Sequence, residues 1–353
     1  MKSRENAPQI TAIIPTYQRP KLLERAIKSV LKQTYQNLQI CVCDNASGDE
    51  TKETVLKISQ EDSRVVYHEH NENIGAVNNF NSGLNMVNSP YFSLLSDDNL
   101  LLPNFYDDAI NALNLNPKAI FFSGQTLRVT SDFKKISGSL DKWKQGLISP
   151  PMGLIHVLEK GIPVWESVLF RSRVLKKVGL LDPSFKHACD QDYIMRIARY
   201  YSFYVSKKPC ALFFVHDESW SANRKLREVL PILTKRMERY LEDEDLPKAL
   251  RERIAKILKI RRNTSIRHFV FNQTIIGKSD EPLNTALSIM KKENNLSPRA
   301  TSLIKFAKYV SQNRIIHNVV SSLIKKYILL KKKVIFIKNI GNYKDYKRIT
   351  IDS

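Results

Sequence analysis

The sequence of 353 residues predicts an α/β protein: a sheet of βαβ units flanked by helices, followed by a basic, mainly helical C-terminal region. Three observations predict this class. Short apolar runs alternate with helical periods from residue 9 to about residue 215, which is the pattern of βαβ units. Strand-like runs nearly vanish beyond residue 221. Most of the excess positive charge lies in that same last third.

The first strand is expected at residues 10–14, where an apolar run ends at Pro15. Pro20 then opens a helix, because a proline at the first helical position sacrifices no backbone hydrogen bond. Residues 131–151 are polar and irregular, so a loop is expected there. The other expected strands are 38–43, 65–68, 91–95, 119–122, 164–170 and 211–215, and the other expected helices follow the turn 44–49 and cover 75–86 and 190–200.

The last third is expected to fold into helices and to form a separate region, residues 222–353, after a first domain of residues 1–221. The first domain carries 26 Lys and Arg against 23 Asp and Glu, whereas the second carries 30 against 12. Such a region suits an anionic surface, either membrane headgroups or nucleic acid, and a merely solvated helical face is an equally simple explanation. The expected helices are 225–241, 246–271, 282–292 and 297–330.

Cysteine usage and the first residues indicate the compartment. The four cysteines have no metal-ligand spacing, and Cys41 and Cys43 share one face of a strand, so we expect reduced thiols. The first residues lack the apolar centre of a signal peptide, and no apolar stretch approaches the roughly 18 residues that span a bilayer. A cytoplasmic protein is therefore expected, with peripheral attachment to the inner face of the membrane as an option.

Two adjacent carboxylates, Asp97 and Asp98, follow the apolar run 91–95 directly. Open α/β sheets bind ligands at the carboxyl ends of their strands, and carboxylate oxygens there can hold a divalent cation that meets a diphosphate. Asp and Asn after a strand are also common turn formers. The pair therefore needs support from other motifs.

Residues 13–20 contain the end of the first expected strand and the turn Pro15-Thr16-Tyr17-Gln-Arg19 that follows it. This turn is similar to the opening strand and turn of the family 2 glycosyltransferases, and the sequence resembles that family over about residues 8–221. The resemblance implies a GT-A fold, a Rossmann-like mixed sheet flanked by helices. It also implies that the backbone of this turn lines the nucleotide base of a nucleotide-sugar donor.

The second segment, residues 42–49, contains Asp44 at the end of the second expected strand. It resembles the family segment whose first Asp contacts the uracil or ribose of the donor. A carboxylate there can accept charge-assisted hydrogen bonds from a base N–H or a ribose hydroxyl. An ordinary Asx turn that caps the next helix is the alternative explanation.

The third segment contains Asn73, Gly75 and Asn81 and leads into the strand before Asp97 and Asp98. It resembles the family's Asn-x-Gly entry, a later Asn, and an Asp-x-Asp whose last Asp holds Mg²⁺ or Mn²⁺. The first Asp of that motif is replaced by serine here. The resemblance therefore assigns the metal to Asp98 and gives Asp97 the middle position beside the donor.

The fourth segment places Asp190 at the start of a helix. It resembles the family's Glu-Asp-x-Asp-Leu-x-x-Arg motif, with Cys189 in place of the Glu, and the resemblance makes Asp190 the catalytic base. An inverting transferase needs such a carboxylate because a sugar hydroxyl is a poor nucleophile until its proton leaves. Simple capping of the helix is the structural alternative.

Two further residues carry less weight. His216 follows the last expected strand and matches the family's His-x-x-Ser pattern, which implies a second metal ligand; a polar residue at a strand end is the alternative. Trp165 lies in a segment that shapes the acceptor pocket in similar proteins. It suits stacking on a sugar face or a place in the core.

These motifs together predict an inverting, metal-dependent glycosyltransferase of the hexosyltransferase type. It would move a sugar from a nucleotide sugar, first of all a UDP-sugar, to a hydroxyl of a glycan or lipid-linked acceptor in cell-surface polysaccharide synthesis. A nucleotidyltransferase is the second enzyme class, although its Gly-rich phosphate loop is missing after the first strand. A non-catalytic binder of membranes or nucleic acid is the third possibility. Because the basic residues spread over helical faces, an anionic membrane is favoured and no nucleic-acid partner is expected.

Overall fold

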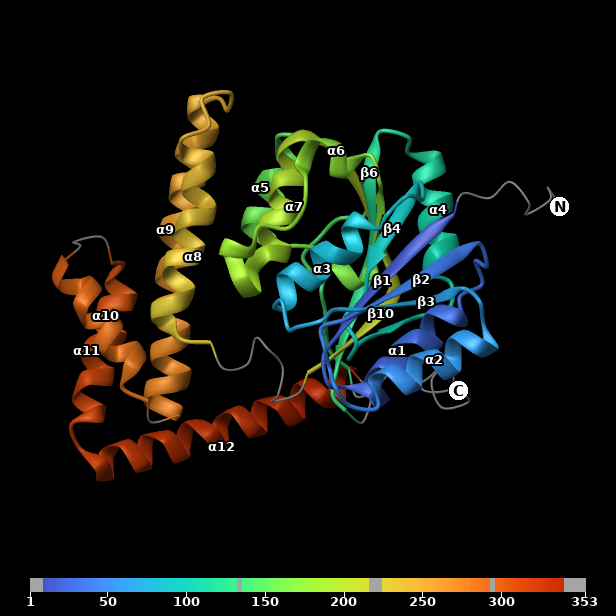
Figure 1. Ribbon diagram of the computed structural model, residues 1–353. Coiled ribbons are helices and arrows are strands. Elements are labelled where there is room, and N and C mark those ends of the chain that lie inside the picture. Colours follow the sequence, from blue (N-terminus) through green and yellow to red (C-terminus); the bar gives the residue numbers. More distant parts are fainter. Residues whose placement is uncertain (1–8, 132–134, 216–223, 278, 293–295, 340–353) are drawn as a thin grey trace. The chain divides into compact units, whose positions relative to one another are not determined.

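The computed structural model describes residues 9–339 except 132–134, 216–223, 278 and 293–295. The chain forms two compact units, Met1–His216 and Asp217–Ser353 (Figure 1), which we describe separately. None of the helices in the described ranges combines the length and apolar character that a membrane span requires.

The described residues of the first unit form ten strands, and the strands expected near residues 10, 38, 65, 91 and 119 are confirmed. The strands are β1 (Ile10–Thr16), β2 (Leu38–Asp44), β3 (Val65–Glu69), β4 (Tyr91–Leu94), β5 (Leu100–Leu101), β6 (Ala119–Val129), β7 (Lys135–Gly138), β8 (Gly146–Ile148), β9 (Val168–Arg171) and β10 (Ser202–Phe214).

Helices fill most of the connections between these strands. They are α1 (Pro20–Leu31), α2 (Thr51–Glu61), α3 (Ala76–Asn85), α4 (Phe105–Leu115), α5 (Met152–Lys160), α6 (Val174–Val178) and α7 (Cys189–Tyr200), with 3-10 turns at Trp165–Ser167 and Pro183–Ala188. Pro20 is the first residue of α1, as the sequence predicts. No element was expected at residues 105–115, where α4 places its apolar residues on the buried side.

All strands belong to one mixed sheet with the order β3-β2-β1-β4-β9-β6-β10-β5, and β7 and β8 pair with β6 and β10. The four strands β3, β2, β1 and β4 are parallel. Strand β9 pairs antiparallel with both β4 and β6, so it reverses the strand direction in the middle of the sheet. This order confirms the predicted α/β class.

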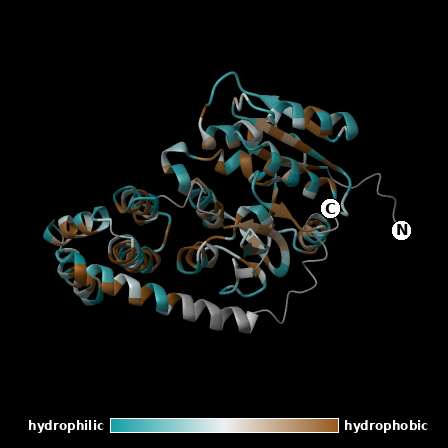
Figure 2. Cartoon of the chain, turned by 90° about the horizontal axis from the view of Figure 1, so that it is seen from below, coloured by the Kyte–Doolittle hydropathy of each residue, from teal (hydrophilic) through white to brown (hydrophobic). Residues whose placement is uncertain are grey.

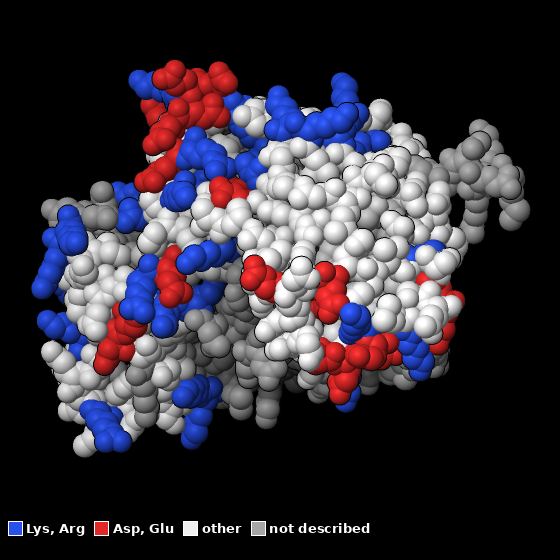
Figure 3. Space-filling view, viewed as in Figure 1, with Lys and Arg blue, Asp and Glu red and all other residues white. Residues whose placement is uncertain are grey.

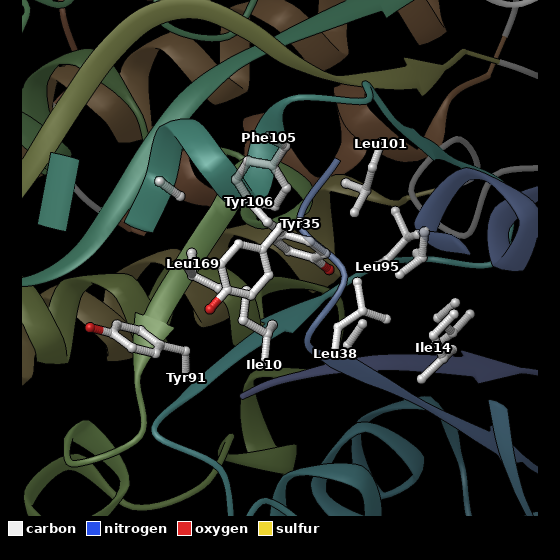
Figure 4. Packing of buried hydrophobic residues seen from close by; sticks show 14 of the residues in the cluster. Ile10, Ile14, Tyr35, Leu38, Tyr91, Leu95, Leu101, Phe105, Tyr106 and Leu169 are labelled. Atoms are coloured by element: carbon white, nitrogen blue, oxygen red, sulfur yellow. The ribbon is translucent and has the colours of Figure 1, made fainter. Parts of the chain in front are cut away.

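Helices cover both faces of the parallel half of the sheet. Alternate side chains of β1, such as Ile10 and Ile14, join the large core beneath α1 and α4; Figure 4 shows Ile10 near Leu169 and Tyr106, and Ile14 on the side of Leu95. Ile13 points to the other face, against α3. The approach there is close, since a Cβ on Gly83 would lie 2.3 Å from the Ile13 Cγ2 atom. The alternation follows from the two-residue period of a strand.

The prediction of a loop at residues 131–151 was wrong, because this segment contains β7 and β8. Gln125 of β6 fixes the turn between them: its side chain accepts a hydrogen bond from the Leu140 N–H at 2.7 Å and donates one to Asp141 at 2.8 Å. Strands of three or four residues are too short for an apolar run that a sequence pattern could detect. Strand β7 pairs with β6 as a hairpin, whereas the partner of β8, β10, is distant in sequence.

Two other expected strands have different limits in the structure. The strand expected at residues 211–215 begins at Ser202, and its register shifts on both sides of Pro209. Proline cannot donate a ladder hydrogen bond and is tolerated at such a bulge, which hides the strand from sequence analysis. The strand expected at residues 164–170 begins only at Val168, after a 3-10 turn that contains Trp165.

The second unit is helical, as the sequence predicts. Its elements are α8 (Leu226–Leu241), α9 (Lys248–Phe269), a π-helical turn (Val270–Ile276), α10 (Glu281–Lys292), α11 (Pro298–Ser311) and α12 (Arg314–Asn339). The acidic residues 242–245 gather at the end of the α8–α9 hairpin (Figure 3).

The prediction of a single helix at residues 297–330 was wrong, because the helix is interrupted between α11 and α12. The Asn313 side chain accepts hydrogen bonds from the N–H groups of Ile315 and Ile316, at 3.0 and 3.2 Å. Asparagine is a strong helix-capping residue, so it starts a new helix here. The apolar periodicity continues through the break and conceals it.

Candidate functional site

The carboxyl ends of three neighbouring parallel strands form one edge of the sheet, and the predicted site residues follow them. Thr16 of β1 pairs in register with Asp44 of β2. On the other side of β1, Ile13 pairs with Leu94 of β4, and Asp97 and Asp98 follow three and four residues later. Open α/β sheets bind ligands at such an edge, where the order of strands reverses.

The carboxylate pair is held by residues of the first turn. The Thr16 hydroxyl donates a hydrogen bond to Asp97 at 2.9 Å, and the Arg19 guanidinium lies 3.1 Å from an Asp98 oxygen and 3.4 Å from Asp97. Burial, and then the charge of Asp98, raise the pKa of Asp97 to about 6. A cation beside this pair is therefore favourable, and Arg19 supplies one.

The backbone of Asp98 is fixed as well. Arg25 of α1 donates a hydrogen bond from Nη2 to the Asp98 carbonyl oxygen at 2.7 Å. The Arg25 guanidinium also lies 4.2 Å from the ring centre of Phe214, at the end of β10. The turn that carries both carboxylates is thus braced by α1 from one side, which suits a site whose geometry must be kept.

Asp44 is buried and stabilises the turn that follows β2. It is 1% exposed, and its carboxylate accepts hydrogen bonds from the Ser47 N–H at 3.1 Å, the Ser47 hydroxyl at 2.5 Å and the Tyr67 hydroxyl at 2.6 Å. A donor that used this carboxylate would replace one of these partners. Its contact with the base or ribose stays a prediction.

Asn73 and Gly75 are joined to that turn. The Asn45 side chain donates to Asn73 Oδ1 at 2.8 Å and accepts from the Ile74 N–H at 2.9 Å. The Gly75 N–H also donates to Asn73 Oδ1. Gly75 has a φ of 83°, a conformation that favours glycine, and it is the N-cap of α3. These residues shape the rim of the sheet edge next to Asp44.

Asn81 lies on α3 and binds protein backbone at both ends of its amide. It donates to the Leu181 carbonyl and accepts from the Leu181 N–H, each at 2.9 Å. Arg196 of α7 holds the same loop by donating to the Leu180 carbonyl at 2.8 Å, while it pairs with buried Asp192 at 2.7 Å. The structure thus gives Asn81 a bracing role next to α7, and its donor contact stays a prediction.

Asp190 lies in the first turn of α7, but it is not the helix cap. The N-cap residue is Ala188, which makes no side-chain hydrogen bond. An Asp190 oxygen accepts from the Gln191 N–H at 2.7 Å. The first turn has a partial positive charge from the helix dipole, which stabilises an ionised carboxylate there. The capping explanation for Asp190 was therefore wrong, and its role as a base stays a prediction.

Backbone strain occurs in or next to three of the four site segments. In the described chain, the non-glycine residues with positive φ are Gln18, Ala46 and Lys186, at 53°, 59° and 47°. Gln18 lies between Tyr17 and Arg19, Ala46 follows Asp44, and Lys186 precedes Asp190. Strained backbone of this kind clusters at functional sites, where surrounding contacts hold it.

Glu166 is a site residue that sequence reasoning did not single out. It is 2% exposed, and its Oε1 atom accepts hydrogen bonds from the Ser96 hydroxyl at 3.1 Å and the Asn99 side chain at 3.0 Å. Its Oε2 atom is buried without a hydrogen-bond partner. Burial, with smaller contributions from the negative charges of Asp98 and Asp190, raises the pKa of Glu166 to about 7.

The environment of Glu166 therefore relates two of the predicted site residues, Asp98 and Asp190. Asp98 and Asp190 are 92 positions apart in the sequence, yet both lie near enough to act on the same buried carboxyl. Asn99 links Glu166 to the end of β10, because the Asn99 Oδ1 atom accepts a hydrogen bond from the Phe214 N–H at 3.0 Å. A charged residue inside the apolar segment before β9 is the signal that could have revealed Glu166.

The raised pKa of Glu166 leads to a prediction on stability. Since the folded protein binds this proton more tightly than the unfolded chain, its contribution to the free energy of unfolding is present at low pH and is lost as pH rises from about 5 to about 7. Glu166→Gln keeps an oxygen for Ser96 and Asn99 but cannot titrate. We expect urea unfolding with EDTA at pH 5, 6, 7 and 8 to show that the free energy of unfolding falls less with rising pH in this variant than in wild type.

Exposed Glu61→Gln, at the end of α2, is the matched control and should leave the pH dependence unchanged. An identical fall in wild type and Glu166→Gln would contradict the raised pKa of Glu166.

The remaining predicted residues are placed as follows. Tyr17 is 41% exposed on the first turn, while Pro15 is buried in β1. Trp165 is 9% exposed and packs on Phe80 with ring centres 4.6 Å apart, so it belongs to the core. His216 lies outside the described residues, and its role as a metal ligand stays a prediction.

The oxygen ligands at this edge of the sheet suit a hard divalent cation that is bound by the protein and the substrate together. Asp98 and Asp97 supply carboxylate oxygens, the ligand type that Mg²⁺ and Mn²⁺ prefer. In the described ranges, no group of three or more His, Cys, Asp or Glu side chains is arranged to hold a metal by itself. Magnesium commonly uses one or two carboxylates together with substrate phosphates, so the residues present fit a cation bound with the donor.

Comparisons with known proteins agree with this arrangement. The sequence profile of Glycosyl transferase family 2 matches residues 11–178. An uncharacterized glycosyltransferase of Rickettsia typhi is 31% identical over 223 residues, which is 62% of this chain and 67% of that protein. A Campylobacter jejuni GalNAc(5)-diNAcBac-PP-undecaprenol beta-1,3-glucosyltransferase is 31% identical over 143 residues, 36% of this chain and 46% of that protein.

Among solved structures, Staphylococcus aureus TarS (residues 1–349), crystallised with UDP-GlcNAc, superposes with a TM-score of 0.62 and 15% identity, over 90% of this chain and 92% of that one. At this identity the likeness shows a shared fold. Together with the profile match and the Rickettsia relative, it shows that this chain belongs to the family 2 glycosyltransferases and has their GT-A fold.

Proposed function

We propose that this glycosyltransferase is an inverting enzyme that moves a sugar from a nucleotide sugar, first of all a UDP-sugar, to a hydroxyl of a glycan or lipid-linked acceptor. The observation that carries the proposal is that buried Glu166 lies within the electrostatic reach of both Asp98 and Asp190, and that Asp98 follows β4 at the edge where β1, β2 and β4 end. One carboxylate serves the leaving group, and the other serves the attacking hydroxyl.

In the proposed reaction, Asp190 accepts the proton of the acceptor hydroxyl. The oxygen then forms a bond to the anomeric carbon while the bond from that carbon to the nucleotide diphosphate breaks, with inversion. Asp190 lies at the positive end of α7, where the helix dipole favours a negative charge. Thr16 and Arg19 position the carboxylates on the donor side.

Asp98, with Asp97 beside it, would hold the divalent cation. When bound, Mg²⁺ or Mn²⁺ would neutralise the charge that develops on the departing diphosphate. In the structure, the positive charge at this position comes from Arg19, 3.1 Å from Asp98. We infer that Arg19 shares the carboxylates with the cation or turns to the diphosphate when the donor binds.

A glycan or lipid-linked acceptor is supported by a relative's name. The Campylobacter protein acts, by its name, on an undecaprenol-linked glycan, but the two chains match over less than half of its length. An acceptor of this type lies at a membrane. Peripheral attachment to the inner membrane face through residues 222–353, and a part in cell-surface polysaccharide synthesis, belong to the same proposal.

A nucleotide screen tests the donor assignment. Thermal unfolding is measured with UDP-, GDP- and dTDP-sugars, each with Mn²⁺, with Mg²⁺ or with EDTA. A ligand present at about 100 times its Kd stabilises the native state by about 2.7 kcal/mol, which raises the Tm by several degrees. We expect the largest rise with a UDP-sugar and Mn²⁺ or Mg²⁺.

A larger rise with GDP- or dTDP-sugars would move the donor assignment to that base. The absence of any rise with all three donors would contradict the proposed donor site.

A further inference from the structure

Helix α12 presents an apolar row on its outer surface. The row consists of Ile315, Val319, Leu323 and Tyr327, which are four residues apart and therefore neighbours on the helix surface. Their exposed fractions are 77%, 53%, 63% and 64%. Figure 2 shows hydrophobic residues alternating with hydrophilic ones along the described part of this helix. We call these four residues the α12 row.

The other side of α12 is fixed to the second unit. His317 lies 2.9 Å from the carbonyl oxygens of Thr274 and Ile275, and the Ser321 hydroxyl donates to the Ile276 carbonyl at 3.0 Å. Val320 and Ile324 pack on the core of the same unit. The helix cannot turn its row inward without breaking these contacts.

The charged residues of α11 and α12 are all basic. Residues 297–339, which include α11 and α12, contain no Asp or Glu and ten Lys or Arg. Lys325 and Lys326 are exposed directly beside Tyr327, and Lys305 and Lys308 lie beside Phe306 and Tyr309, which are themselves exposed on α11. Exposed aromatic residues and lysines next to an apolar row are typical of helices that lie at a lipid interface.

We propose that the α12 row and its neighbouring lysines form a docking surface for an anionic lipid bilayer. The row would enter the boundary between headgroups and acyl chains, while Lys325 and Lys326 contact acidic headgroups. A second copy of this chain fits less well, because a self-paired surface would place lysines against lysines with no acid in either helix. This inference deepens the membrane attachment included in the proposed function, but it does not rest on the transfer reaction itself.

The test uses the full chain and vesicles of phosphatidylcholine, with or without 30% phosphatidylglycerol, in a co-sedimentation assay at low salt and at 0.5 M NaCl. Wild type should bind the anionic vesicles and release them at high salt, since headgroup attraction is screened. Val319→Ser/Leu323→Ser/Tyr327→Ser should weaken binding by at least about tenfold. Lys325→Gln/Lys326→Gln should weaken it by about 30-fold, at about 1 kcal/mol per lysine.

Matched controls change the same number of exposed apolar residues or lysines elsewhere. Leu56→Ser/Leu115→Ser/Leu147→Ser alters exposed leucines of the first unit, and Lys142→Gln/Lys144→Gln alters exposed lysines there. Both should bind vesicles like wild type. Circular dichroism and urea unfolding check that every variant is folded.

Several results would overturn the proposal. These are equal binding to vesicles without phosphatidylglycerol, equal binding by the row variant and its control, or tighter binding to a DNA duplex than to vesicles. A change of mass in solution from dimer to monomer in the row variant would assign the row to a second copy. Since no nucleotide is present in the assay, failure of the donor proposal leaves these outcomes unaffected.

Discussion

Asp190→Asn should abolish sugar transfer while nucleotide binding is retained. The variant keeps the size of the side chain and one acceptor oxygen in the first turn of α7, but it replaces the basic carboxylate that accepts the acceptor proton with an amide. A positioned general base contributes roughly 10²- to 10⁴-fold to the rate. The transfer rate with the donor identified by the screen should fall by that factor, and calorimetric titration should show an unchanged Kd for UDP with Mn²⁺.

Gln191→Ala, the next residue in the same turn, serves as the control and should keep most of the activity. Near-normal turnover by Asp190→Asn would refute the role of Asp190. A loss of nucleotide binding in the same variant would instead indicate that Asp190 supports the donor side of the site.

Asp98→Asn should remove the part of nucleotide binding that depends on a divalent cation. The substitution removes the ionised oxygens that the cation would share with the diphosphate, and Asp97 is already engaged by Thr16 and Arg19. Calorimetry with UDP should give a Kd that Mn²⁺ improves at least about tenfold for wild type and hardly at all for Asp98→Asn, a loss in the range seen when metal sites are weakened.

Asp108→Asn is the matched control, since Asp108 is an α4 carboxylate paired with Lys208 at 2.7 Å. It should respond to Mn²⁺ like wild type. A full Mn²⁺ effect in Asp98→Asn would show that the cation is held elsewhere, and the assignment of Asp98 would then be wrong.

Local signals in the sequence were sufficient for the parallel half of the sheet. The runs that became β1, β2, β3 and β4 are apolar because they are buried strands, and Pro20 marks the start of α1. The turns after these strands carry the residues that match the family motifs. They could therefore be located without coordinates, and their common edge follows from the parallel pairing of neighbouring βαβ units.

Elements that depend on distant partners could not be located in the same way. Strand β8 has three residues and pairs with β10, which is distant in sequence, while β7 is a short strand that forms a hairpin with β6. Pro209 interrupts the pattern of β10, and Asn313 divides α11 from α12 inside a continuous apolar period. In each case a single residue or a remote pairing overrides the local periodicity.

The sequence by itself determined the class of fold, the family and the candidate residues, because strand runs, turn residues and motif spacing are local properties of the chain. Only the tertiary structure decided that Asp44 is buried among its own hydrogen bonds, that Ala188 rather than Asp190 caps α7, and that Glu166 lies near both Asp98 and Asp190. The physical reason is that burial and charge proximity depend on which distant segments meet. That information resides in the packing of β4, β9 and α7 and in no single stretch of sequence.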